Sequence, residues 1–161
     1  MIRSLAPLAA LLISDALVLL GHGLLLTLIP VSASKLGFSD FQVGLTASSY
    51  FIGFVFGCLM TPYVLKRVGH IRTFAVLASA YTTIILLFVW SQSFIGWMLL
   101  RFIIGAMVAG IYMIIESWLN ERADSNNRGS ILSFYAMLNL AMITLAQHYY
   151  TDHTLPENRE E

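Results

Sequence analysis

Five long apolar runs, separated by short polar connections, limit how this chain can fold. They cover roughly residues 5–29, 43–65, 73–90, 94–115 and 131–146. A helix needs about 20 apolar residues to cross a hydrocarbon core of about 30 Å, a length that the first, second and fourth runs reach. Because lipid offers no water to backbone N–H and C=O groups, segments that cross it form helices. The runs therefore predict an all-α polytopic membrane bundle of about five transmembrane helices.

The composition supports a lipid environment. Hydrophobic residues make up 58% of the chain and charged residues 11%, whereas soluble domains carry about 25% charged residues. The formal net charge of zero gives no indication of a nucleic-acid partner. The single cysteine, Cys58, excludes an internal disulfide and a multi-cysteine metal site, and we interpret it as a buried packing residue.

The distribution of Lys and Arg predicts the orientation in the membrane. Successive connections alternate between the two sides, and one side holds Lys35 and, if the tail emerges there, Arg159. Six cations fall on the other side: Arg3, Lys66, Arg67, Arg72, Arg122 and Arg128. Under the positive-inside rule this bias predicts a cytoplasmic amino terminus, for a multi-pass protein of the inner (plasma) membrane.

Small residues at intervals of about four predict closely packed helix faces in the second and fourth runs. Lipid gives helices no hydrophobic reason to associate, so they approach where small side chains allow backbone contact. The second run carries Ser49, Gly53, Gly57 and Thr61, and the fourth carries Gly105, Ala106 and Gly110. Pro30 and Pro62 lie near the ends of the first two runs, where prolines often terminate helices, and a kink at Pro62 is the alternative.

Two ionisable residues, Asp15 and Arg101, lie well inside apolar runs. Each costs about 2.5–3.5 kcal/mol on insertion scales, which favours a partner or a wet cavity. Their depths differ by roughly 5 Å, so an ion pair facing a cavity is predicted if the first and fourth helices are neighbours. A purely structural pair, or an Arg101 that snorkels outward, is the alternative. His22 lies two helical turns after Asp15 and extends this candidate midplane coupling site.

The chain carries no motif of a known enzyme active site. It lacks H-E-x-x-H, G-x-S-x-G and G-x-x-x-x-G-K, and its glycine-rich patches lie inside the apolar runs. The sequence therefore predicts neither an enzyme nor a cofactor or metal site.

The basic turn L-K-R-V-G-H-I-R at residues 65–72 resembles the signature loop of the major facilitator superfamily. That signature reads G-x-x-x-D-[RK]-x-G-[RK]-[RK], and Arg67 and Gly69 match it. Lys66 stands where the family has Asp, and Glu116 is the acid that we expect to replace it by pairing with Arg67 or Arg72. The remaining departures are Pro62, His70 and Ile71 in place of the first Gly and the terminal basic pair.

Two further stretches resemble the same family. Arg101 followed by Gly105 is similar to its fourth-span pattern, and E-S-W-L-N at 116–120 with Arg128 and Gly129 resembles a bacterial subgroup whose substrates are mostly unassigned. The resemblance implies a rocker-switch secondary transporter with a midplane site between two six-helix halves. It also implies a cytoplasmic gate built from Arg67, Gly69, Arg72, Glu116, Arg128 and Gly129.

The number of runs implies only part of such a transporter. We expect residues 1–147 to form a partial amino-terminal bundle and the polar tail at 148–161 to be disordered or an artefact of truncation. The expected function is transport of a small solute, proton-coupled, by a carrier that is inactive in this truncated form. The alternative is a non-transporting remnant or helix-association partner. Its small-residue faces would then drive homo-oligomers or bind a missing carboxy-terminal portion.

Overall fold

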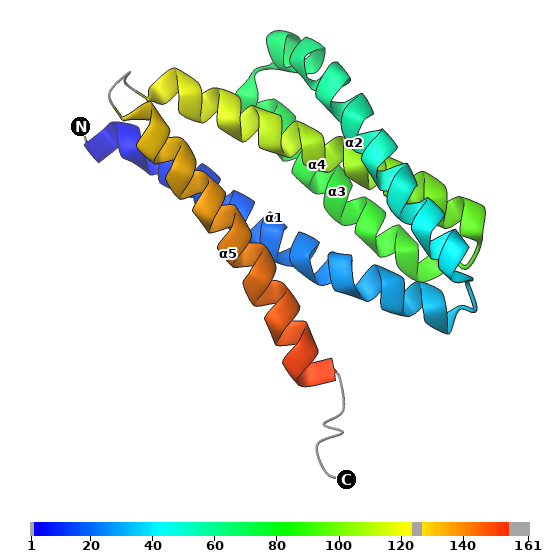
Figure 1. The fold of residues 1–161 in the computed structure, drawn as a ribbon. Coiled ribbons are helices and arrows are strands. Elements are labelled where there is room, and N and C mark those ends of the chain that lie inside the picture. Colours follow the sequence, from blue (N-terminus) through cyan, green and yellow to red (C-terminus); the bar gives the residue numbers. More distant parts are fainter. Residues whose placement is uncertain (1, 124–126, 155–161) are drawn as a thin grey trace. The chain divides into compact units, whose positions relative to one another are not determined.

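A computed structural model describes residues 2–123 and 127–154 and contains five helices there (Figure 1). The predicted all-α class is confirmed. The side chains of Arg3, Arg122 and Arg159, which entered the orientation argument, lie outside the described part of the chain. The helices are α1 (Ile2–Lys35), α2 (Asp40–Val68), α3 (His70–Trp90), α4 (Phe94–Arg122) and α5 (Arg128–Thr154).

Each helix is longer than the apolar run that predicted it. All five contain a segment of 19 to 29 residues that is long and apolar enough to cross a membrane. Helix α5 continues to Thr154, so residues 148–154 are helical where disorder was expected, and the remaining tail lies outside the described residues. The polar residues of this extension keep their i to i+4 backbone bonds, which do not require apolar side chains.

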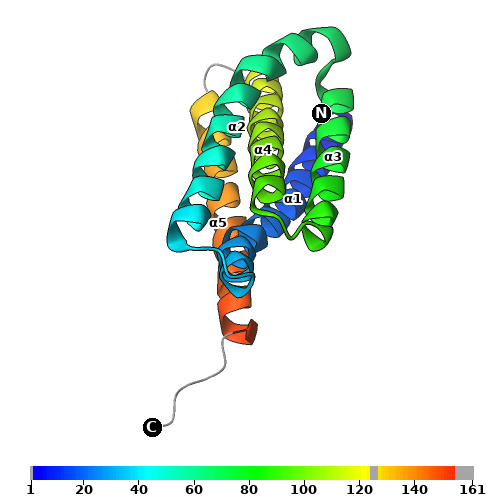
Figure 2. The ribbon, with the colours of Figure 1, turned by 90° about the vertical axis from the view of Figure 1, so that its right-hand side faces the viewer.

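Neither proline near a run end terminates its helix, which corrects that expectation. Pro30 lies inside α1 and Pro62 inside α2. Each proline removes only one backbone N–H from a helix, a loss that membrane helices tolerate. Figure 2 shows the carboxy-terminal end of α2 turning away from the line of the rest of the helix, as a proline bend does.

The described residues divide into two compact units. One comprises Met1–Ser32 with Asn126–Glu161, and therefore most of α1 together with α5. The other comprises Ala33–Ser125 and contains α2, α3 and α4. In this second unit α4 lies between α2 and α3 (Figure 2).

The predicted small-residue faces meet one another at the crossing of α2 and α4. A methyl group added at Gly53 would overlap the carbonyl oxygen of Phe102, and one at Gly57 would lie 2.7 Å from the Cα of Ala106. The Ser49 hydroxyl donates a hydrogen bond of 2.7 Å to the carbonyl oxygen of Met98. The small residues of α2 therefore lie directly against α4 in this unit.

The fourth-run face continues toward α3. A methyl group added at Gly110 would lie 2.6 Å from Leu77 Cδ1 of α3 and 3.0 Å from the hydroxyl of Thr61. Thr61 itself donates to the carbonyl of Gly57, one turn earlier in α2. One stripe of small residues on α4 therefore packs against both neighbours.

An aromatic cluster joins the two polar turns at one end of this unit. The ring of Phe38 packs edge-on against Phe94 and Trp97, with centroids 5.9 and 5.4 Å away. Trp97 also contacts Phe88 and donates its indole N–H to the carbonyl of Ser91 at 2.7 Å. These contacts hold the connection before α2 against the turn between α3 and α4.

Helices α1 and α5 also cross at a glycine. A methyl group added at Gly23 would lie 2.8 Å from the Cβ of Ala146 and 2.9 Å from the carbonyl oxygen of Ile143. Gly23 was not among the predicted packing residues, because it stands outside any regular small-residue stripe.

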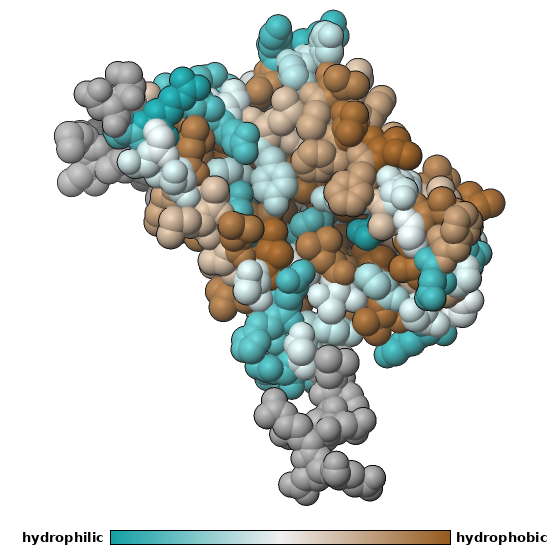
Figure 3. Space-filling view, viewed as in Figure 1, coloured by the Kyte–Doolittle hydropathy of each residue, from teal (hydrophilic) through white to brown (hydrophobic). Residues whose placement is uncertain are grey.

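Hydrophobic side chains dominate the outer faces of the helices. Figure 3 shows brown apolar surface along the helices and teal polar surface gathered at helix ends. Phe51, Phe134 and Met137 are examples, each more than 60% exposed. Such surfaces suit contact with lipid chains.

Candidate functional site

Asp15 and His22 lie on the buried side of α1. Asp15 and His22 are 0% and 4% exposed, and Leu19 between them is also buried. Their spacing of four and then three residues is that of a single helix face. Neither carboxylate oxygen of Asp15 has a hydrogen-bond partner among the described residues. A buried carboxylate without such a partner is costly in its charged form, so this position favours a proton, a cation or a partner outside these contacts.

Arg101 of α4 is buried among tyrosines of the same unit. It is 5% exposed, and its guanidinium carbon lies 5.2 Å from the centroid of the Tyr50 ring on α2. Tyr81 of α3 is buried in the same unit. A cation over a desolvated aromatic face is stabilised by about 2 kcal/mol. The Nε atom of Arg101 has no hydrogen-bond partner among the described residues.

The predicted ion pair between Asp15 and Arg101 joins residues of different units. Asp15 belongs to the unit Met1–Ser32 with Asn126–Glu161, and Arg101 to Ala33–Ser125. The pair therefore stays a prediction, supported by the burial of both side chains.

The basic turn contains a backbone conformation that explains its glycine. Gly69 ends α2 and precedes α3 with φ of 83° and ψ of 164°. This region of backbone space is essentially restricted to glycine. The Gly69 carbonyl accepts a hydrogen bond from the Thr73 hydroxyl at 2.7 Å. Arg67 and Arg72, on either side of the turn, are exposed.

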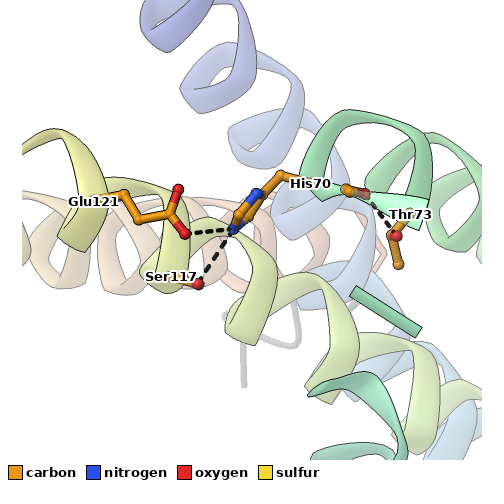
Figure 4. A network of polar contacts seen from close by, with 5 residues as sticks. His70, Thr73, Ser117 and Glu121 are labelled. Carbon is orange, nitrogen blue, oxygen red and sulfur yellow. Dashed lines mark hydrogen bonds and ion pairs between the residues drawn. The ribbon is translucent and has the colours of Figure 1, made fainter. Parts of the chain in front are cut away.

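The acid that reaches this turn is Glu121, not the expected Glu116. The Nε2 atom of His70 lies 3.4 Å from Glu121 Oε1 and 3.2 Å from the Ser117 hydroxyl (Figure 4). Glu116 is exposed, and no ion pair joins it to Arg67 or Arg72 in the described part of the chain. Glu116 and Glu121 are five residues apart, so they point from different sides of α4.

The last two predicted gate residues belong to the other unit. Arg128 and Gly129 are exposed and form the first turn of α5. A methyl group at Gly129 would meet nothing within 4 Å. Their part in a gate remains a prediction.

Each unit holds a hollow, and neither hollow is lined by Asp15, His22 or Arg101. The α1–α5 unit holds a groove of about 500 Å³ lined by apolar residues and by His148, Asp152 and His153. A smaller one of about 190 Å³ lies among α2, α3 and α4, beside Gly57, Thr61 and Thr73. Among the described residues, no three His, Cys, Asp or Glu side chains gather closely enough to hold a metal ion.

Comparison with known proteins gives one consistent family. The model of the Major Facilitator Superfamily matches residues 11–146. An uncharacterised MFS-type transporter named YcaD from Salmonella arizonae is 33% identical over 132 residues, which cover 82% of this chain and 35% of the relative. The protein of the same name from Salmonella dublin is 34% identical over 131 residues, 81% of this chain and 34% of that one. No solved structure matches the chain.

The matched region contains every feature on which the resemblance was based. It includes Asp15, the basic turn at Gly69 and Arg101, within helices of membrane-spanning length. The chain spans about a third of the length of the curated relatives it matches. It is a multi-pass membrane protein that belongs to the Major Facilitator Superfamily.

Proposed function

We propose that this chain supplies five helices of the first half of a secondary carrier that moves a small solute across the inner membrane. Protons are the coupling ion in this proposal, and Asp15 is the group that binds them. The observation that carries it is a carboxylate, fully buried in a membrane-spanning helix, with no hydrogen-bond partner for either oxygen among the described residues. Intramembrane carboxylates of this kind commonly mark proton pathways.

The proposed coupling follows from the cost of a buried charge. When Asp15 binds a proton it becomes neutral, and the energetic penalty of enclosing it in an apolar environment falls. When it releases the proton, the carboxylate requires a counter-charge, and Arg101 is the candidate. His22, two turns along the buried side of α1, is a candidate for passing the proton along this helix.

We further propose that these 161 residues do not transport on their own. Alternating access requires two repeats that move against each other around one site. The described helices belong to one such repeat. The alternative role, association with copies of itself through the small-residue faces, is weakened because Gly53 and Gly57 are already packed against α4.

Carbodiimide labelling tests the proton-binding role without requiring transport. A hydrophobic carbodiimide reacts with protonated carboxyl groups in apolar surroundings, and mass spectrometry locates the adduct. We expect an adduct at Asp15 that forms faster at low pH and is slowed by the right solute in a panel. Asp40→Asn, which removes an exposed acid at the start of α2, is the matched control. This variant should form the Asp15 adduct as the wild type does. Absence of an Asp15 adduct from pH 5 to 9 would contradict the proposal.

Reconstitution tests the second part. The purified chain is placed in liposomes that contain a pH-sensitive dye, and candidate solutes are added outside. We expect no solute-dependent change of internal pH. Saturable proton movement that disappears in Asp15→Asn would show that five helices suffice and would overturn the proposed inactivity.

A further inference from the structure

The contact between His70 and α4 combines a titratable cation with a carboxylate at the end of two spans. His70 is the first residue of α3, and Ser117 and Glu121 lie one turn apart near the end of α4 (Figure 4). We call these three residues the α3–α4 clasp. Its distances, 3.4 Å to Glu121 and 3.2 Å to Ser117, allow the same Nε2 atom to address either partner.

We propose that the α3–α4 clasp closes when His70 binds a proton and loosens when that proton leaves. Histidine is the side chain whose ordinary charge change falls between pH 5 and 8. When His70 is protonated, its Nε2–H donates a hydrogen bond to the Glu121 carboxylate. The opposite charges of the two groups strengthen this bond. Deprotonated, the ring is neutral and keeps only an ordinary hydrogen bond with Ser117 or Glu121.

No neighbouring described cation competes for the same carboxylate. Lys66 and Arg67 end α2 and Arg72 follows on α3, and all three are exposed. Within the described residues none of them forms an ion pair with Glu121, and the α4 acid Glu116 forms none with His70. Among the side chains that the structure describes in this unit, His70 is the one that forms an ion-pair contact with Glu121.

The clasp lies where it can hold or release the first turn of α3. Gly69, immediately before His70, has a conformation that interrupts the helical backbone between α2 and α3. The first backbone N–H groups of a helix have no partner within it, and no side chain caps those of α3. Besides the bonds from the Thr73 amide and hydroxyl to the Gly69 carbonyl, the clasp is a side-chain contact that holds this first turn. Loosening it frees the first turn of α3 without unfolding the rest of the helix.

The expected size of the effect is modest. The Glu121 side chain is 60% exposed and that of His70 is 20% exposed, so solvent screens the pair. Exposed pairs change an equilibrium roughly two- to fivefold. That is sufficient to bias a movable helix end toward one state.

Hydrogen exchange of the first turns of α3, in the full chain in lipid nanodiscs, tests the clasp. Wild type and His70→Gln are compared at the same pH, so the intrinsic exchange rates cancel. We expect amides of residues 73–77 to exchange roughly two- to fivefold more slowly in wild type at pH 5.5, and equally at pH 8.0. Exchange of Glu121→Gln, divided by that of His70→Gln at the same pH, should give the same ratio at pH 5.5 and at pH 8.0. For Glu116→Gln this ratio should change with pH as it does for wild type.

His70→Arg provides the complementary variant, since its charge is present at both pH values. It should protect the start of α3 equally at pH 5.5 and 8.0. Amides around Trp97, at the far end of the same unit, report whether each variant remains folded. The proposal is overturned if wild type and His70→Gln differ by the same factor at both pH values. It is also overturned if the exchange of Glu121→Gln relative to His70→Gln changes with pH as that of wild type does.

Discussion

Replacing Gly53 by alanine tests the backbone contact on which the α2–α4 pair depends. The added methyl group would overlap the Phe102 carbonyl oxygen and lie 2.8 Å from the Phe102 Cα. Both are backbone atoms, so no side-chain rotation relieves the overlap. Ordinary contacts of a Cβ lie at 3.4 Å or more, and α2 must therefore move away from α4.

Two effects of Gly53→Ala lower the free energy of unfolding, and one effect raises it. Overpacking of a closely packed site costs about 1–3 kcal/mol. Separation of the helices also stretches the 2.7 Å hydrogen bond from Ser49 to Met98, one turn away, and interhelical bonds in membranes are worth about 0.6 kcal/mol. Alanine stabilises a helix by about 1 kcal/mol relative to glycine. The net expectation is a loss of about 0.6–2.6 kcal/mol in the free energy of unfolding.

The matched control is Gly44→Ala on the same helix. A methyl group there meets nothing within 4 Å, so this variant should be neutral or more stable by up to about 1 kcal/mol. Unfolding in mixed micelles, followed by the fluorescence of the buried Trp97 and Trp118 of α4, measures both. If the two variants unfold at the same detergent ratio, the close approach of α2 and α4 is not as described.

The remaining predictions concern the basic turn, the intramembrane charges and the orientation. Gly69→Ala should lower the free energy of unfolding by about 1–3 kcal/mol, measured in the same micelles, because its backbone conformation suits glycine alone. A double-mutant cycle of Asp15→Asn and Arg101→Gln on folded yield should show coupling, and strict additivity would mean that the two do not meet. In a cysteine-free background, cysteines at Ser4 and Ser34 should be labelled from opposite sides, and labelling of Ser34 from the cytoplasm only would reverse the predicted orientation.

The glycine positions illustrate where sequence reasoning succeeded and where it stopped. The four-residue spacing of Gly53 and Gly57 predicted a close helix contact, since only small residues allow one in lipid. The spacing did not say that the partner was the similar face of α4. It also missed Gly23, whose close approach to α5 involves a single residue without a repeating pattern.

The basic turn shows a similar division. Its cations, its glycine and its departures from the family signature were all readable in the sequence. The expected acid was Glu116, because its depth along the fourth run suited the turn. Glu121 makes the contact instead, since the rotation of α4 about its own axis, set by packing against α2 and α3, decides which acid faces His70.

The sequence by itself determined that the chain crosses the membrane as helices. Apolar length and the scarcity of charge are sufficient for that, because the bilayer requires internal backbone hydrogen bonds over a given thickness. Only the tertiary structure decided which helices are neighbours, and which polar side chains meet in the α3–α4 clasp. Lipid tails are as apolar as the helix faces that they cover, so hydropathy distinguishes lipid from water but not lipid from another helix.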